Sequence, residues 1–143
     1  MTAHKTTTLR SPWDRWYRHA LPAYWIFLFS LTHFPAPQLP VRVRWADKLT
    51  HMACFGLLAF LFWRFGETFR RPVSNRFVWL ALFWMGAYAA LDEWSQSFVG
   101  RGADVVDWVA DMLGAALVLA VLEWRRRRLR SANQTLDSLE TRR

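Results

Sequence analysis

The chain has 143 residues, enough for one domain, and 53% of them are hydrophobic. Aromatic residues make up 17%, including ten Trp and eleven Phe, which is too high for a typical soluble domain of this size. The net charge is +8, but the basic residues flank apolar runs and no known nucleic-acid-binding motif is visible. A membrane protein with Arg-rich cytoplasmic ends therefore explains the charge better than nucleic-acid binding, and the single cysteine excludes an internal disulfide.

The first predicted element is a polar, basic N-terminal arm over residues 1–18, followed by an apolar helix. Residues 20–41 contain no Asp, Glu, Lys or Arg, and a transmembrane helix over about 16–34 fits a bilayer core of about 30 Å. A cleaved signal peptide is the alternative, because a basic region precedes an apolar one. No clear A-x-A cleavage site follows, which favours the helix.

The second predicted helix covers about 48–65, after a proline-containing loop. Asp47 precedes it and is expected to act as the N-cap. His51 follows Asp47 by four positions, so the two side chains should share one face at the start of the helix.

The third apolar run has only 15 residues, from Phe77 to Leu91, which is short for a membrane span. Continued as a helix over about 77–98, it reaches an adequate length. This places Asp92 and Glu93 in the last turns of a membrane helix, with Gln96 on the same face as Asp92.

The fourth predicted helix covers about 104–123, with Asp104 as its N-cap. Asp104, Asp107 and Asp111 follow i, i+3, i+7 spacing and should form one acidic stripe. Gly114 and the alanines after it are small and should allow close helix packing.

Topology is predicted from the positions of Lys and Arg. Fifteen of the 19 lie in the N-terminal arm, in the loop between the second and third helices, or in a basic tail over 125–143. The positive-inside rule then places both termini in the cytoplasm, with a transmembrane domain over 19–124. The sequence thus predicts an all-α transmembrane four-helix bundle, whose acidic segments meet at the outer face.

Two polar blocks give this layout a family resemblance. The first block, D-K-x-x-H-x-x-x-F, is Asp47, Lys48, His51 and Phe55. The second, D-E-x-x-Q-x-F…R…D-x-x-x-N-x-x-G, is Asp92, Glu93, Gln96, Phe98, Arg101, Asp107, Asp111 and Gly114. The chain resembles the VanZ-like family of small bacterial membrane proteins, named after a teicoplanin-resistance protein. The resemblance implies a multi-pass protein of the bacterial inner membrane and cell envelope, with a link to antibiotic resistance, and it supplies no reaction.

Asp111 departs from this pattern, because the family more usually has Asn there. The extra charge predicts either a protonated carboxyl group or a pairing with Lys48 or Arg101. For Lys48, the expected role is a salt bridge, and its candidate partners are Asp92, Glu93 and Asp111. For Arg101, the planar guanidinium could hold the phosphate of an undecaprenyl-type head group.

The favoured function is binding of a membrane lipid, or of a lipid or glycolipid envelope precursor, at the outer polar site. The candidate binding residues are Asp47, Lys48, Gln96, Arg101, Asp104, Asp107 and Asp111. One alternative is an enzyme in which Asp92, Glu93 and His51 do acid–base work on a lipid-linked substrate. The other is a small proton-coupled transporter, for which a homo-oligomer is an open question.

No cofactor, metal or nucleic acid is predicted. The oxygen-rich set around His51 would suit Mg, Mn or Ca, but the sequence contains no H-E-x-x-H motif and no cluster of Cys and His. The structural alternatives are an ion-pair network that fixes helix register, and for Asp47 a helix cap alone.

Overall fold

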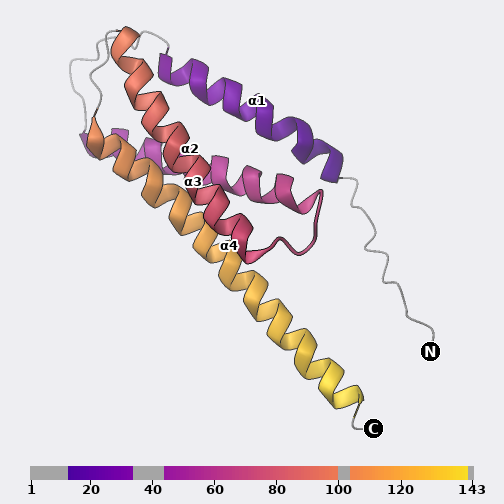
Figure 1. Ribbon diagram of the computed structural model, residues 1–143. Coiled ribbons are helices and arrows are strands. Elements are labelled where there is room, and N and C mark those ends of the chain that lie inside the picture. Colours follow the sequence, from indigo (N-terminus) through magenta and orange to yellow (C-terminus); the bar gives the residue numbers. More distant parts are fainter. Residues whose placement is uncertain (1–12, 34–43, 100–103, 142–143) are drawn as a thin grey trace.

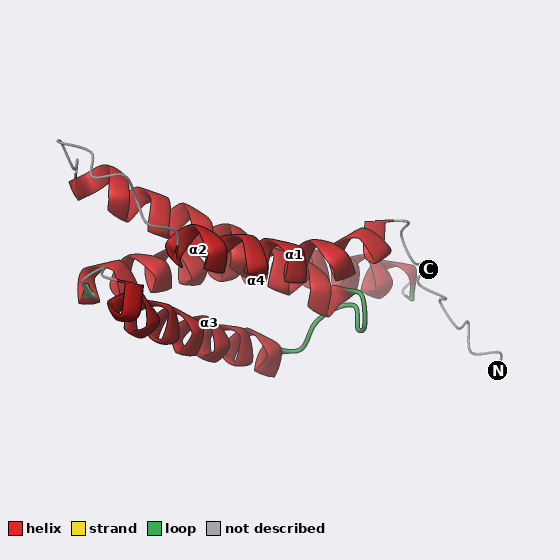
Figure 2. Ribbon diagram, turned by 90° about the horizontal axis from the view of Figure 1, so that it is seen from above, coloured by secondary structure: helices red, strands yellow, loops and turns green. Residues whose placement is uncertain are grey.

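The computed structural model describes residues 13–33, 44–99 and 104–141, and these ranges contain four α-helices and no strand (Figure 1). The helices are α1 (Trp13–His33), α2 (Arg44–Glu67), α3 (Asn75–Gln96) and α4 (Val105–Glu140). A short 3₁₀ turn, Ser97–Val99, follows α3. Figure 2 shows helices throughout, apart from the connecting loop and turn, which confirms the predicted all-α class.

Helices α2 and α4 form the most extensive contact of the bundle. They approach closely because Gly114 has no side chain: a Cβ atom on Gly114 would lie 2.0 Å from the carbonyl oxygen of Met52. Gly56 lies on the other side of the same contact, where an added Cβ atom would be 3.4 Å from the Gly114 carbonyl oxygen. The small residues predicted to bring helices together therefore do so.

Alternate helix direction brings distant segments to a common end of the bundle (Figure 1). The C-terminal ends of α1 and α3 lie beside the N-terminal ends of α2 and α4. We call this the acidic end, formed by residues 32–33, 45–51, 92–99 and 104–111. The opposite end, formed by residues 14–18, 64–76 and 122–130, carries most of the described arginines and is called the basic end.

The outside of the bundle is apolar, as is its core. The core is built around Phe55, Leu58, Met85 and Leu119, which are almost completely buried. Large hydrophobic side chains are also exposed on every helix. An apolar exterior of this extent is typical of a protein that meets lipid or a partner.

Two helices are long and apolar enough to cross a membrane, α2 over Trp45–Glu67 and α4 over Val105–Glu140. Only 33% and 28% of their apolar windows are buried, whereas the core helix of a soluble protein would be mostly buried. Helices α1 and α3 do not meet the same criterion. Length and apolar composition therefore support two of the four predicted spans.

Three predicted helix boundaries are wrong. Helix α1 begins at Trp13, so the end of the predicted N-terminal arm is helical. Helix α2 begins at Arg44, so Asp47 lies in its first turn and is not the N-cap. Helix α4 continues to Glu140, and most of the predicted basic tail is therefore helical. Arginine and leucine favour helix, and the i, i+4 pair between Glu123 and Arg127 stabilises the extension.

Candidate functional site

The start of α4 is fixed by side chains from its own first turns and from α2. Asp104 is the N-cap, as predicted, because its carboxylate accepts a hydrogen bond from the Val106 N–H at 2.8 Å. Lys48 on α2 donates to Asp104 Oδ2 at 2.7 Å and also to Asp107 Oδ1. Its ammonium group thereby joins the N-terminal ends of the two helices.

Lys48 forms a salt bridge, as expected, but its partners differ from those predicted. The partners considered from the sequence are Asp92, Glu93 and Asp111. Lys48 pairs instead with the first turn of α4, since the two helices start side by side at this end.

His51 lies one turn further along α2 and contacts the next carboxylate of the acidic stripe. Its Nδ1 atom is 3.0 Å from Asp111 Oδ1, and its Nε2 atom is 4.0 Å from Asp107 Oδ2. Asp111 is completely buried, and the imidazole is its partner in place of Lys48. Arg101, the other expected partner, lies outside the described residues.

Glu93 on α3 reaches the same region from the third helix. Its Oε2 atom accepts a hydrogen bond from the backbone N–H of Asp104 at 2.8 Å. Its Oε1 atom is buried and has no hydrogen-bond partner among the described residues, and the same holds for Asp111 Oδ2. Each of these oxygens has lost water without gaining a partner, which is unfavourable in a buried carboxylate.

Asp92 faces a different neighbour from Glu93, as their adjacent positions on one helix predict. Its Oδ1 atom accepts from the Thr32 hydroxyl at 2.9 Å, and its Oδ2 atom accepts from the Gln96 amide at 2.8 Å. The side chain is 1% exposed, so it points into the bundle. Both oxygens are used, which makes Asp92 a join between α1 and α3.

His33, at the end of α1, is a site residue that the sequence interpretation missed. Its Nε2 atom is 2.8 Å from the Ser95 hydroxyl. Its Nδ1 atom lies 2.8 Å from the Phe29 carbonyl oxygen, so this nitrogen carries the hydrogen. One feature of the sequence could have identified it. Thr32 and His33 are polar residues at the end of an apolar run, and polar residues within a membrane segment are candidates for a functional site.

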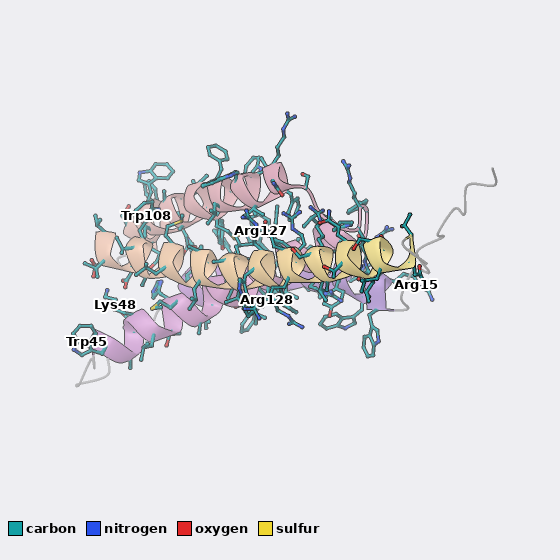
Figure 3. All side chains as sticks on the ribbon, turned by 90° about the horizontal axis from the view of Figure 1, so that it is seen from below. Arg15, Trp45, Lys48, Trp108, Arg127 and Arg128 are labelled. Atoms are coloured by element: carbon teal, nitrogen blue, oxygen red, sulfur yellow. The ribbon has the colours of Figure 1, made fainter. Side chains whose placement is uncertain are left out.

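The structure brings most of the predicted site residues together, from three helices. Lys48 and Trp108 lie toward the same end of the molecule in Figure 3, with Arg15 at the other end. Asp47 is exposed at the rim, yet ligand atoms of Asp47, His51 and Asp107 lie within 4.8 Å of one another. A second, more buried set with the same spacing is His51, Glu93 and Asp111.

An apolar groove adjoins the polar residues. It runs between α2 and α4 and has a volume of about 480 Å³. Its lining includes Leu49, Met52, Gly56, Leu117 and Val118. Leu49 and Met52 directly follow Lys48 and His51 in the sequence, so the groove begins within one helical turn of the polar site.

The apolar exterior, the long helices and the carboxylate-rich end are the features of a small helical membrane protein with a polar site at its acidic end. The chain belongs to the VanZ/LLP1 family, whose family model matches residues 5–126. This confirms the resemblance drawn from the two polar blocks. No curated protein and no solved structure gives a match.

Proposed function

We propose that this protein crosses the bacterial inner membrane with all four helices, with both termini in the cytoplasm and the acidic end at the outer face. Helices α1 and α3 have 21 and 22 residues, which correspond to about 32 Å at 1.5 Å per residue and match a bilayer core. Ile26 and Phe27 on α1, and Trp79 and Phe83 on α3, are more than half exposed. The Lys and Arg distribution supports the orientation, since the arginine-rich segments gather at the basic end.

We further propose that the acidic end binds a membrane lipid or a lipid-linked envelope precursor. The observation that carries this proposal is the apolar groove of about 480 Å³ that begins beside Lys48 and His51. A polar site continuous with an apolar groove matches a lipid, whose head group is polar and whose chain is hydrocarbon. Burial of that chain against α2 and α4 would contribute about 0.8 kcal/mol for each methylene group.

The charges of the site favour a particular head group. Its described acidic side chains are Asp47, Asp92, Glu93, Asp104, Asp107 and Asp111. Carboxylates only accept hydrogen bonds, so they suit a head group that donates through hydroxyl or amine groups. A sugar-bearing or amine-bearing lipid therefore fits the described residues better than a bare phosphate. Binding of phosphate by Arg101 is a separate expectation and lies outside the described residues.

Native mass spectrometry of the protein released from membranes tests this proposal. We expect one lipid to be retained on each chain, with a head group that carries hydroxyl or amine groups. Ala53→Phe should remove it, because Ala53 is exposed and lines the groove, where a phenyl ring would take the space of the hydrocarbon.

Ala87→Phe is the matched control. Ala87 is also an exposed helical alanine, but it lies on α3, away from the groove. It should retain the lipid. Equal lipid retention by Ala53→Phe and Ala87→Phe would contradict binding in the groove, and release of both as lipid-free protein would contradict the lipid assignment.

A second candidate, acid–base catalysis on the bound lipid, is favoured by the contact between His51 and Asp111. A carboxylate at 3.0 Å from Nδ1 holds one tautomer of the imidazole and leaves Nε2 as a base. An enzyme should convert the retained lipid into a product of different mass, and His51→Gln should stop that conversion without releasing the lipid. Recovery of an unaltered lipid from both proteins would leave binding as the function.

A further inference from the structure

We propose that His51, Glu93 and Asp111 form a binding site for a divalent first-row metal cation of the Mn²⁺ or Zn²⁺ class. The three side chains come from α2, α3 and α4, so the cation would join three helices at the acidic end. This site goes beyond the proposed lipid binding and does not depend on it.

The geometry brings three ligand types to one point. One ligand atom from each of His51, Glu93 and Asp111 lies within 4.8 Å of the other two. Bonds of about 2.0–2.2 Å from one metal ion to nitrogen and oxygen place neighbouring ligand atoms roughly 3 to 4 Å apart. The His51 Nδ1 to Asp111 Oδ1 distance of 3.0 Å already falls in that range. Glu93 needs a side-chain shift of less than about 2 Å.

The buried oxygens supply an independent reason for a cation. Asp111 is 0% exposed and Glu93 is 7% exposed, and each has one carboxylate oxygen without a hydrogen-bond partner in the described part of the chain. Lys48 is already bonded to two other carboxylates, so it does not offset these charges. A proton can link only two of the three groups, whereas a metal ion coordinates all of them at once.

The neighbouring set of Asp47, His51 and Asp107 is the weaker candidate. Asp47 is exposed, and the carboxylate of Asp107 accepts a hydrogen bond from the ammonium group of Lys48. The Asp107 Oδ2 atom lies 4.0 Å from His51 Nε2, which is beyond hydrogen-bond distance, so Asp107 adds negative charge beside the imidazole without bonding it.

The ligand set decides the class of metal. One imidazole nitrogen with two carboxylate oxygens suits Mn²⁺ or Zn²⁺ better than Ca²⁺, which prefers six to eight oxygens. Three protein ligands leave at least one position open on the metal, as in catalytic zinc sites.

Titration of the purified full-length protein with Mn²⁺ tests the proposal. The protein, in detergent, is stripped with a chelator, and free Mn²⁺ is measured by its electron paramagnetic resonance signal. We expect one Mn²⁺ bound to each chain, with displacement by Zn²⁺. Asp111→Asn and Glu93→Gln should each weaken binding at least about tenfold, because each removes a charged ligand.

Asp14→Asn is the matched control, since Asp14 is a buried carboxylate at the other end of the bundle, paired with Arg71. It should bind Mn²⁺ as the parent protein does. Circular dichroism and gel filtration check that each variant folds. Unchanged affinity in folded Asp111→Asn and Glu93→Gln would overturn the proposal.

A measurement on the parent protein keeps the test decisive if the variants do not fold. Electron spin echo spectroscopy of the bound Mn²⁺ should show the nitrogen coupling of one imidazole. The histidines of the chain are few, and His51 is the one that lies in both described sets of possible ligands. Absence of bound Mn²⁺, or bound Mn²⁺ without imidazole nitrogen, would also overturn the proposal.

Discussion

The two ends of the bundle handle buried charge in opposite ways. At the basic end, the buried Arg126 guanidinium bonds the Val73 carbonyl, the Asn75 side chain and Glu123. Arg71 pairs with the buried Asp14 in the same region. Each of these buried charges faces one of opposite sign. Together the contacts of Arg126 fix α4 to the start of α3 and the segment that precedes it.

At the acidic end, the described carboxylates outnumber the described cations that face them. Among these residues, Lys48 offsets Asp104 and Asp107, whereas Glu93 has no cationic side chain bonded to it and Asp111 has only an imidazole. Breaking a buried pair usually destabilises a protein, and a buried charge without a partner already carries that cost. The comparison shows that the described buried charges face opposite charges at the basic end, whereas at the acidic end, where we propose ligand binding, they are only partly balanced.

The largest expected effect comes from the helix contact beneath the acidic end. In Gly114→Ala the new Cβ atom would lie 2.0 Å from the Met52 carbonyl oxygen, so α2 and α4 must separate. We expect a loss of more than about 3 kcal/mol in the free energy of unfolding, measured by detergent titration with tryptophan fluorescence.

Gly66→Ala makes the equivalent change at the basic end. Its Cβ atom would meet the ring of Phe77 at 2.3 Å, and a side chain moves more easily than a backbone. The loss should be smaller than for Gly114→Ala. A greater loss for Gly66→Ala would contradict the prediction, because the contact of Gly66 with Phe77 would then matter more to stability than the contact of Gly114 with Met52.

The next effect tests the structural role of the basic end. Arg126→Met should lower the free energy of unfolding by about 3 kcal/mol, because Asn75 and the Val73 carbonyl lose their buried partner. Arg127→Met is the control: Arg127 bonds the same Glu123 at 2.7 Å but is 71% exposed. Its loss should be no more than about 0.5 kcal/mol. Equal losses would refute the distinction between buried and exposed partners.

A smaller effect is expected from the join between α1 and α3. Asp92→Ala removes the acceptor of both the Thr32 hydroxyl and the Gln96 amide and should cost about 2 kcal/mol. Asp92→Asn keeps one acceptor oxygen and should cost less. The same detergent titration measures both. If Asp92→Ala were neutral, Asp92 would not hold α1 against α3.

The smallest effect is expected for a substitution of Asp111. Unlike the other variants, this one is not expected to lower the free energy of unfolding. In the presence of a chelator, Asp111→Asn should leave stability unchanged or raise it by up to about 1 kcal/mol, because it removes a buried charge that, among the described residues, only His51 offsets. Added Mn²⁺ should stabilise the parent protein and not this variant. A loss of 2 kcal/mol or more in chelator would show that the Asp111 charge is already balanced within the chain.

The candidate site could be predicted in part because its residues follow local spacing rules. The i, i+4 pair of Asp92 and Gln96, the Asp104 cap and the stripe of Asp104, Asp107 and Asp111 all follow from local helix geometry. The choice of partners could not be predicted. Lys48 and His51 each face several carboxylates, and only the register of α2 against α4 selects Asp107 for one and Asp111 for the other.

The sequence by itself determined the helical class, the apolar exterior and the family, because hydrophobic runs and polar blocks are local features of the chain. The tertiary structure decided which buried charges are paired and that His33 lies among the residues of the acidic end. Burial and pairing depend on which helices meet and at what register. These properties arise from packing between segments far apart in sequence, such as Gly114 against Met52.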